Sequence, residues 1–339
     1  MAKVYFLGMR NPADETHDFR LVKVGVTAGD VAIRVAQLQT GNPFELRCLS
    51  TFETTCARQV EHFIHRAHAA DMQNLEWIRR SQAEVAVLVE QARAAAQRFE
   101  ERKRIEDEIK TLPSAGHARR ADAHEIRLHR IARDLLKELV PAKLQLEITS
   151  NRLRAATGST HGIEGIVRAR YVPEARRFSP QRAHALFPDL ASGCVVEDVH
   201  GRFIWTRVPR RSKFVNENLA AKESAAAADA AATAVLESRN QLDGWTQRSV
   251  ETEQLHDSYL KALQIVHRLG ADLEDLQSEL IIRMGDYDAV EPVCSFKRTR
   301  CRTLNSAEFC HRHPEEARMC SEIMSPQVRK FVYPTRSYI

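Results

Sequence analysis

The stretch that decides the fold of the N-terminal part is Val22-Lys23-Val24-Gly25-Val26-Thr27. Its β-branched residues, bounded by loop residues, predict a strand. A second short run, Val4-Tyr5-Phe6-Leu7, precedes it, and a polar, proline-containing segment at residues 11–15 separates the two. This segment has the composition of a turn. The two runs therefore predict a β-hairpin at the start of the chain.

The hydrophobic period changes after this hairpin. Apolar residues recur at helical spacing over residues 31–38, and Asp30 stands where an N-cap is expected. Beyond a break at residues 41–43, residues 46–52 predict a third strand and residues 56–69 a second helix. The predicted order is strand, strand, helix, strand, helix.

Several short motifs accompany this order. They are, along the chain, Tyr5 in the first strand, Lys23-Val24-Gly25-x-Thr27, Arg34, Leu38 to Pro43, Glu61-x-x-x-His65 and Glu76-Trp77-Ile78. Together they resemble the GIY-YIG nuclease superfamily, in its phage T5-type DNA-binding branch. The resemblance covers residues 1–80 and implies a domain, residues 1–82, with a small mixed sheet and flanking helices that acts on DNA.

The resemblance also implies catalytic roles. Tyr5 would help to activate a water, Arg34 would face the phosphate, and Glu61 would hold Mg²⁺ or Mn²⁺. These residue types suit phosphodiester hydrolysis, because carboxylate oxygen binds hard cations. The planar guanidinium of arginine meets phosphate oxygens with two hydrogen bonds and keeps its charge.

Three further residues belong to the predicted site. Lys23 replaces the second tyrosine of the family motif, and it can bind phosphate or, if desolvated, act as a base. His65 follows Glu61 by one helical turn on the same face, where a phosphate contact and a structural role are both open. Thr27 is a predicted DNA contact.

Composition limits the class of protein. The chain has 339 residues, which suffices for two or three domains. It lacks a signal-peptide pattern and any window of eighteen apolar residues, so we expect a cytoplasmic protein without a membrane partner. Seven cysteines, an odd number, favour reduced thiols. A net charge of +5 does not by itself establish a nucleic-acid partner.

The rest of the chain alternates helical and mixed segments, which predicts an α+β protein. Residues 83–156 predict a helical hairpin that forms an arm, and residues 214–285 a second helical segment. Residues 157–213 and 286–339 each predict a small basic α+β module. The helical segments also leave self-association into a homo-oligomer open.

The second module repeats the first. The matching residues are, in chain order, Glu164 with Glu291, Arg170 with Lys297, Phe178-Ser179 with Leu304-Asn305, Pro188 with Pro314, Ala191 with Ala317, Cys194 with Cys320, and Arg202-Phe203 with Lys330-Phe331. We therefore predict two copies of one structural unit, each following a long helical segment. The pattern resembles the C-terminal part of lambda-type phage exonucleases, which implies an accessory role near DNA.

Basic residues gather in both modules. The predicted DNA contacts there are Arg168, Arg170, Arg207, Arg210, Arg211, Lys297 and Arg298. Basic strands interleaved with aromatic residues suit phosphate contact and stacking, although a merely solvated basic face is the alternative. Cysteines and histidines of the second module match no common zinc spacing, so we expect no zinc there.

The predicted function is that of a metal-dependent DNA endonuclease, with Mg²⁺ or Mn²⁺ as cofactor and a phage or mobile-element origin. The alternative is a non-catalytic DNA-binding protein with the same fold. A scaffold whose long helices self-associate is the third class.

Overall fold

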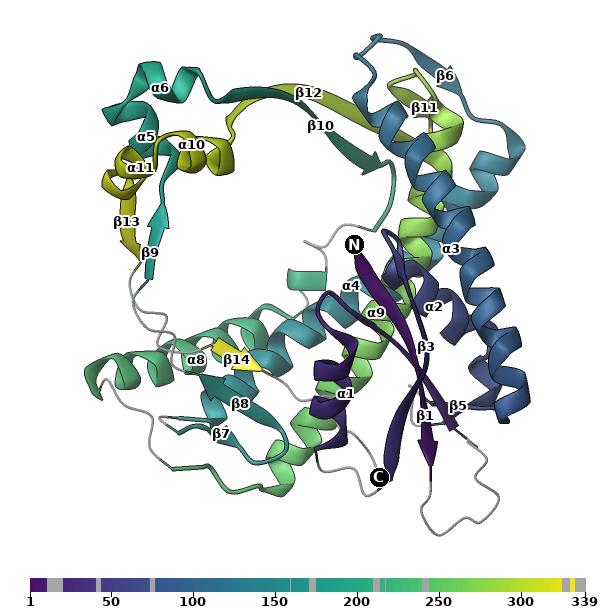
Figure 1. Cartoon of the computed structure of the whole chain (residues 1–339), viewed down its shortest axis with the longest axis vertical. Helices are drawn as coiled ribbons and strands as arrows, with labels where there is room; N and C mark the ends of the chain where they lie inside the picture. The colour runs from purple at the N-terminus through teal and green to yellow at the C-terminus, as the bar shows by residue number, and fades with distance from the viewer. Residues whose placement is uncertain are drawn as a thin grey trace. The chain divides into compact units, whose positions relative to one another are not determined.

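The computed structural model describes residues 1–10, 21–40, 44–73, 77–158, 160–170, 175–209, 214–216, 218–239, 244–324 and 330–332 (Figure 1). Helices and mixed sheets place the protein in the α+β class, as predicted. The chain forms two compact units, Met1–Glu108 and Ile109–Thr335. Within the described ranges, none of the helices has the length and apolar character needed to cross a membrane.

The first unit is built on a five-stranded sheet of order β3-β1-β2-β5-β4. The strands are β1 (Ala2–Arg10), β2 (Leu21–Thr27), β3 (Glu45–Thr54), β4 (Met72–Gln73) and β5 (Trp77–Arg79). The central strand β1 pairs antiparallel with β2 and β3. The predicted hairpin and third strand are confirmed.

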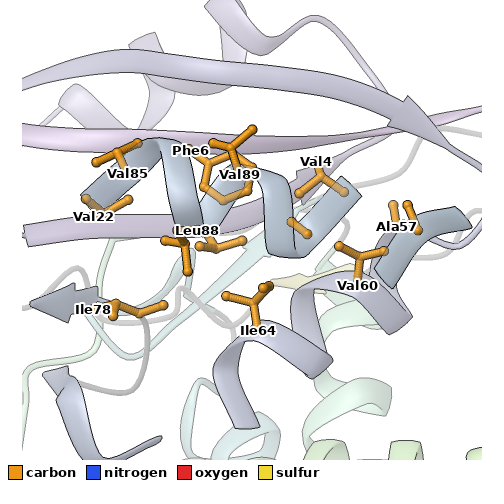
Figure 2. Close-up of a cluster of buried hydrophobic side chains, with 13 residues drawn as sticks. Val4, Phe6, Val22, Ala57, Val60, Ile64, Ile78, Val85, Leu88 and Val89 are labelled. Carbon is orange, nitrogen blue, oxygen red and sulfur yellow. The ribbon is translucent and has the colours of Figure 1, made fainter. Parts of the chain in front are cut away.

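The helices of this unit are α1 (Val31–Gln39), α2 (Ala57–Ala67), a 3₁₀ turn (Ala69–Asp71) and α3 (Gln82–Thr111). One face of the sheet, with Val4 and Val22, packs against Ile64 of α2 and Leu88 of α3 (Figure 2). Glu100 of α3 also accepts hydrogen bonds from the Thr54 hydroxyl (2.7 Å) and the Thr55 amide (3.1 Å). The order of elements predicted for residues 1–82 is observed.

The predicted helical arm at residues 83–156 is wrong. The apolar stripe of α3 recurs at helical spacing and closes the core of the first unit, since Val85, Leu88, Val89, Ala92 and Ala96 are buried there. The boundary between the two units falls within α3. Most of α3 therefore belongs to the first core, and α3 does not form half of a hairpin with the next helix.

The second unit contains the two repeats. The first copy comprises β6 (Ala118–Arg120), α4 (Ala123–Ala156), β7 (Gly162–Ile163), β8 (Val167–Arg170), β9 (Ala175–Phe178), α5 (Pro180–Leu186), α6 (Pro188–Ser192) and β10 (Val195–Trp205). The second comprises α9 (Val250–Met284), β11 (Ala289–Glu291), β12 (Cys294–Leu304), α10 (Ser306–Arg312), α11 (Pro314–Met319), β13 (Ser321–Met324) and β14 (Lys330–Val332). Between them lies α8 (Leu219–Arg239), which packs on α4 through Ala225, Leu144 and Ile148.

The two copies exchange strands. The last strand of the first copy, β10, pairs antiparallel with the first long strand of the second copy, β12, as the long ribbon in Figure 1 shows. In return β8 pairs with β14 and β9 with β13. Equivalent residues are paired in the two ribbons. Val195 opposes Leu304 in one ribbon, and their equivalents, Ser321 and Phe178, oppose each other in the other. The repeat is confirmed, but residues 157–213 and 286–339 interleave and are not separate modules.

The equivalence extends into the long helices. Asp122 with Glu125 forms the capping box of α4, and Ser249 with Thr252 forms that of α9. The two helices pack on each other in opposite directions: the start of α4 lies in one cluster with the end of α9, and the end of α4 in another with the start of α9. The antiparallel partner of α4 is therefore α9 and not α3.

Four short helices close the far end of both ribbons. Their shared core contains Ala183 and Phe309, which are equivalent positions, together with Cys194 and Cys320. The Ser179 amide donates to the Cys320 carbonyl (3.0 Å), and the Asn305 amide donates to the Cys194 carbonyl (2.9 Å). Each copy thus anchors the helix of the other in the same way.

The ribbon leaves no room for a side chain at Gly201 of β10. A Cβ atom there would overlap the ring of Phe296, which is buried on the neighbouring strand. We expect Gly201→Ala to lower the free energy of unfolding by about 1–3 kcal/mol through overpacking. Urea unfolding followed by circular dichroism measures this.

The matched control is Gly193→Ala, because the nearest atom to a Cβ at Gly193 is the Leu190 carbonyl oxygen at 3.5 Å. In the double variant Gly201→Ala with Phe296→Leu, the loss in free energy of unfolding should be smaller than the sum of the losses in the two single variants. Equal losses for Gly201→Ala and Gly193→Ala would contradict this packing.

Candidate functional site

Three predicted site residues lie in or contact Lys23-Val24-Gly25 of β2, with Tyr5 and Lys23 on the sheet face opposite to the one that α2 covers. Tyr5 opposes Gly25 in the antiparallel register, and its ring lies over the glycine. A Cβ at Gly25 would come within 2.5 Å of the phenol oxygen, so only glycine leaves space for the ring. Tyr5 is 2% exposed. The Tyr5 ring is therefore buried against β2 at the position where Gly25 has no side chain.

Lys23 lies on the same face of the sheet as Gly25, since alternate residues of a strand share a face. It pairs with Trp77 of β5, and its Nζ lies 6.0 Å from the centroid of the Trp77 ring. Such a distance allows a cation–π attraction. Only 7% of Lys23 is exposed, so this cation is largely removed from water.

His65 of α2 reaches the same strand from the side. Its Nε2 lies 3.2 Å from the carbonyl oxygen of Val24. A carbonyl only accepts, so Nε2 carries the proton in this contact. β5 pairs with residues Leu21 to Lys23 of β2. The carbonyl that His65 contacts belongs to the following residue, Val24. Glu61 lies one turn before His65 on the same helix face and is half-buried.

Arg34 comes from α1, whose start is fixed by local hydrogen bonds. Asp30 accepts from the amides of Ala32 (2.6 Å) and Ile33 (3.3 Å) as an N-cap. The Thr27 hydroxyl oxygen accepts from the Gly29 amide at 3.1 Å, so Thr27 shapes this turn. Arg34 is half-buried, and its Nη1 donates to Gln37 at 3.4 Å.

The end of α1 is tied to β3. The Gln39 side chain donates to the Phe44 carbonyl (3.0 Å) and accepts from the Leu46 amide (2.8 Å). Hydrogen bonds therefore hold both ends of α1, the helix that carries Arg34. This helix packs beside β3, which flanks β1 on the side away from β2. Of the predicted catalytic residues, Tyr5 and His65 contact the strand segment that contains Lys23, whereas Arg34 is held by the contacts of α1.

The predicted Mg²⁺ or Mn²⁺ ion stays a prediction, with Glu61 as its one predicted carboxylate ligand. Across the described part of the chain, no three His, Cys, Asp or Glu side chains are grouped closely enough to form a protein-only metal site. Mg²⁺ commonly keeps several waters and takes one or two carboxylates. Glu61 can supply one such carboxylate.

The predicted DNA contact at Arg298 is wrong. Arg298 is 9% exposed, and its guanidinium donates to the Asp288 carboxylate (2.5 Å) and to the carbonyl oxygens of Gly285 (2.9 Å) and Tyr287 (3.2 Å). It also lies over the Phe296 ring at 5.1 Å. Burial acts to raise the pKa of Asp288, but hydrogen bonds from Ser114, Gly116 and Arg298 outweigh it and lower that pKa. Arg298 therefore ties together β12 and the end of α9.

The other predicted contacts of the second unit fare differently. Lys297 and Arg168 are exposed, and Arg207 is exposed with a left-handed backbone (φ 51°). Arg170 lies in β8, while Arg210 and Arg211 lie outside the described residues. The prediction missed Arg202, which is exposed and directly opposite Lys297. The signal that could have found it is its match with Lys330 in the repeat.

Comparison with known proteins found no matching family model, no matching curated protein and no matching solved structure. The GIY-YIG resemblance therefore stays a prediction from the motifs.

The contact between Tyr5 and Gly25 gives a test of the site. We expect Gly25→Ala to displace the Tyr5 ring and to lower the free energy of unfolding by about 1–3 kcal/mol. Gly29→Ala is the control, because its nearest neighbour is the Thr27 hydroxyl at 3.8 Å. Thermal unfolding and tyrosine fluorescence measure the two effects. A Gly25→Ala protein as stable as Gly29→Ala would show that the ring is not held there.

Arg298 and its neighbour Lys297 give a matched pair of variants. Arg298→Ala leaves the Asp288 carboxylate partly buried without its ion partner, so we expect a loss of about 3–5 kcal/mol in unfolding free energy. Lys297→Ala, on the exposed face, should change it by less than about 0.5 kcal/mol. Chemical denaturation of both proteins measures the two losses. Similarly small losses for Arg298→Ala and Lys297→Ala would contradict the burial of Arg298.

Proposed function

We propose that this protein is a divalent-metal-dependent DNA endonuclease whose active site is formed by the first unit. The observation that carries the proposal is that three predicted site residues lie in or contact Lys23-Val24-Gly25: the Tyr5 ring lies on Gly25, Lys23 is largely buried, and His65 bonds to the Val24 carbonyl. The motif resemblance supplies the reaction class, and the basic strands of the second unit supply a surface that suits a polyanion.

The residues suit hydrolysis of a phosphodiester. A water attacks phosphorus, the bond to one ester oxygen breaks, and the attacking water gives up a proton. Tyr5, which is nearly dry, would orient that water, Lys23 would bind phosphate oxygens as a cation, and the leaving ester oxygen would take up the proton that the water releases. Arg34 would bind the phosphate oxygens. Glu61 would hold the Mg²⁺ or Mn²⁺ ion, which when bound offsets the charge that develops on the phosphate.

A non-catalytic DNA-binding protein is the second candidate. The observation that favours it is the burial of Tyr5 and Lys23, whose side chains are 2% and 7% exposed in the described structure. In that reading Tyr5 fills the sheet surface, Lys23 supports Trp77, and Arg34 holds phosphate without turnover. The two candidates differ in what the Glu61 carboxylate does.

Cleavage of supercoiled, linear and single-stranded DNA with Mg²⁺ or Mn²⁺ separates the candidates. We expect wild-type protein to nick DNA, and Glu61→Ala to lose at least about a hundredfold in rate while still binding DNA, as the loss of an essential transition-state contact does. Glu90→Ala is the control, because Glu90 is an exposed carboxylate on α3 of the same unit.

Binding with no metal-dependent cutting by wild-type protein would support the DNA-binding protein instead. Equal cleavage by Glu61→Ala and Glu90→Ala would remove Glu61 from the site. An absence of any affinity for DNA would end both candidates.

A further inference from the structure

The ribbon formed by β10 and β12 has two different faces. One face carries Phe203 and Phe296, which belong to a buried cluster, and the guanidinium of Arg298. The other face carries Arg202 and Lys297, which are both exposed. These two residues are direct partners in the antiparallel register. Two cations therefore stand opposite each other on the face turned away from the core.

This arrangement opposes folding of the ribbon. Like charges directly opposite each other on paired strands are destabilising. Within the part of the chain that the structure describes, neither Arg202 nor Lys297 forms an ion pair with a carboxylate. Farther along the same ribbon, Arg302 opposes Glu197 and bonds to it at 2.9 Å, so opposite charges are used where they serve the pairing. The pair of cations needs a reason other than stability.

The internal repeat shows that the pair is retained. Arg202 is equivalent to Lys330, and Lys297 to Arg170, and in the other ribbon Lys330 opposes Arg170 in the same register. Of the adjacent residues, Phe203 and Phe331 are the same in both copies, whereas Ala169 stands where the second copy has Phe296. Packing explains the residues shared in the cores, such as Leu153 and Leu280, which are both fully buried. It does not explain two cations kept at opposed positions in both ribbons.

We propose that these two basic pairs are phosphate-binding sites for the two strands of a DNA duplex, one pair to a strand. The first site is formed by Arg202 and Lys297, and the second by the register positions of Arg170 and Lys330. A phosphate between two opposed cations removes their repulsion and accepts hydrogen bonds from both. Phosphate contacts of this kind fix the placement of a protein on DNA without reading its sequence.

The choice of a duplex follows from symmetry. The exchanged strands relate the two copies by an approximate two-fold axis, so the two basic pairs are equivalent. The antiparallel strands of a duplex are also related by two-fold axes, which is why two-fold proteins match duplex sites. A single strand has no such axis. The inference rests on the proposed function in taking DNA as the ligand, but it requires no catalysis.

The test is the salt dependence of DNA binding by the full chain in the absence of divalent ions, with a fluorescent duplex and the corresponding single strand. We expect Arg202→Gln with Lys297→Gln to reduce the slope of log affinity against log salt by about 0.9 for the duplex, since the pair binds one phosphate and each phosphate contact adds about 0.9. Arg170→Gln with Lys330→Gln should reduce it by the same amount. All four substitutions together should reduce it by the sum.

The control removes the same charge elsewhere in the unit: Arg130→Gln with Arg133→Gln, on the exposed face of α4, should leave the slope nearly unchanged. Thermal unfolding adds an independent readout. Loss of Arg202 and Lys297 relieves a repulsion, so that variant should unfold at the wild-type temperature or slightly above it.

Three results would overturn the inference: a control effect as large as that of a basic pair, an effect confined to one ribbon, or equal slope changes for duplex and single strand. Wild-type cleavage of DNA with unchanged slopes in the variants would reject the two sites and leave the proposed function intact. A wild-type chain without affinity for DNA would reject both.

Discussion

Antiparallel pairing between β10 and β12 is the interaction on which the second unit depends. It joins strands that belong to different copies of the repeat, and its counterpart joins β8 and β9 to β14 and β13. Among the described strands, β8 pairs within its own copy only with the short β7, and β12 only with the short β11, so neither copy completes its sheet alone. The helix pair α4 and α9 lies at one end of the ribbons, and the four short helices lie at the other end. The unit has the architecture of a two-fold dimer contained within one chain.

Local patterns in the sequence predicted much of the first unit. The strand at residues 22–27, the N-cap at Asp30 and the helix around Glu61 depend on nearest neighbours and on hydrophobic period, which a sequence displays directly. The role of α3 did not follow in the same way. Its apolar stripe is visible, but the surface that covers such a stripe is chosen by the tertiary structure, and here it is the sheet of the first unit.

The same distinction explains what was found and missed among the basic residues. Strand alternation places Lys297 and Arg298 on opposite faces, but it does not say which face is covered. In the structure, Arg298 is buried with Asp288, and Lys297 is exposed beside Arg202. Matching the two copies predicted the repeat, but not that they would exchange strands, because a sequence match is equally compatible with two separate modules. At the candidate site, the pairing of Tyr5 with Gly25 follows from the hairpin, whereas the bond from His65 to Val24 depends on where β5 stops.

The exchange of strands also affects how the chain folds as it leaves the ribosome. The residues of β8 emerge long before those of β14, with which they pair, and β10 likewise emerges well ahead of β12. During that interval both strands of the first copy present unpaired edges, which are the features that lead to association between chains. Contacts so distant in sequence also form slowly. Newly made molecules at high local density can satisfy the same strands between two chains, so synthesis rate and protein concentration become determinants of whether the second unit closes on itself or links to a neighbour.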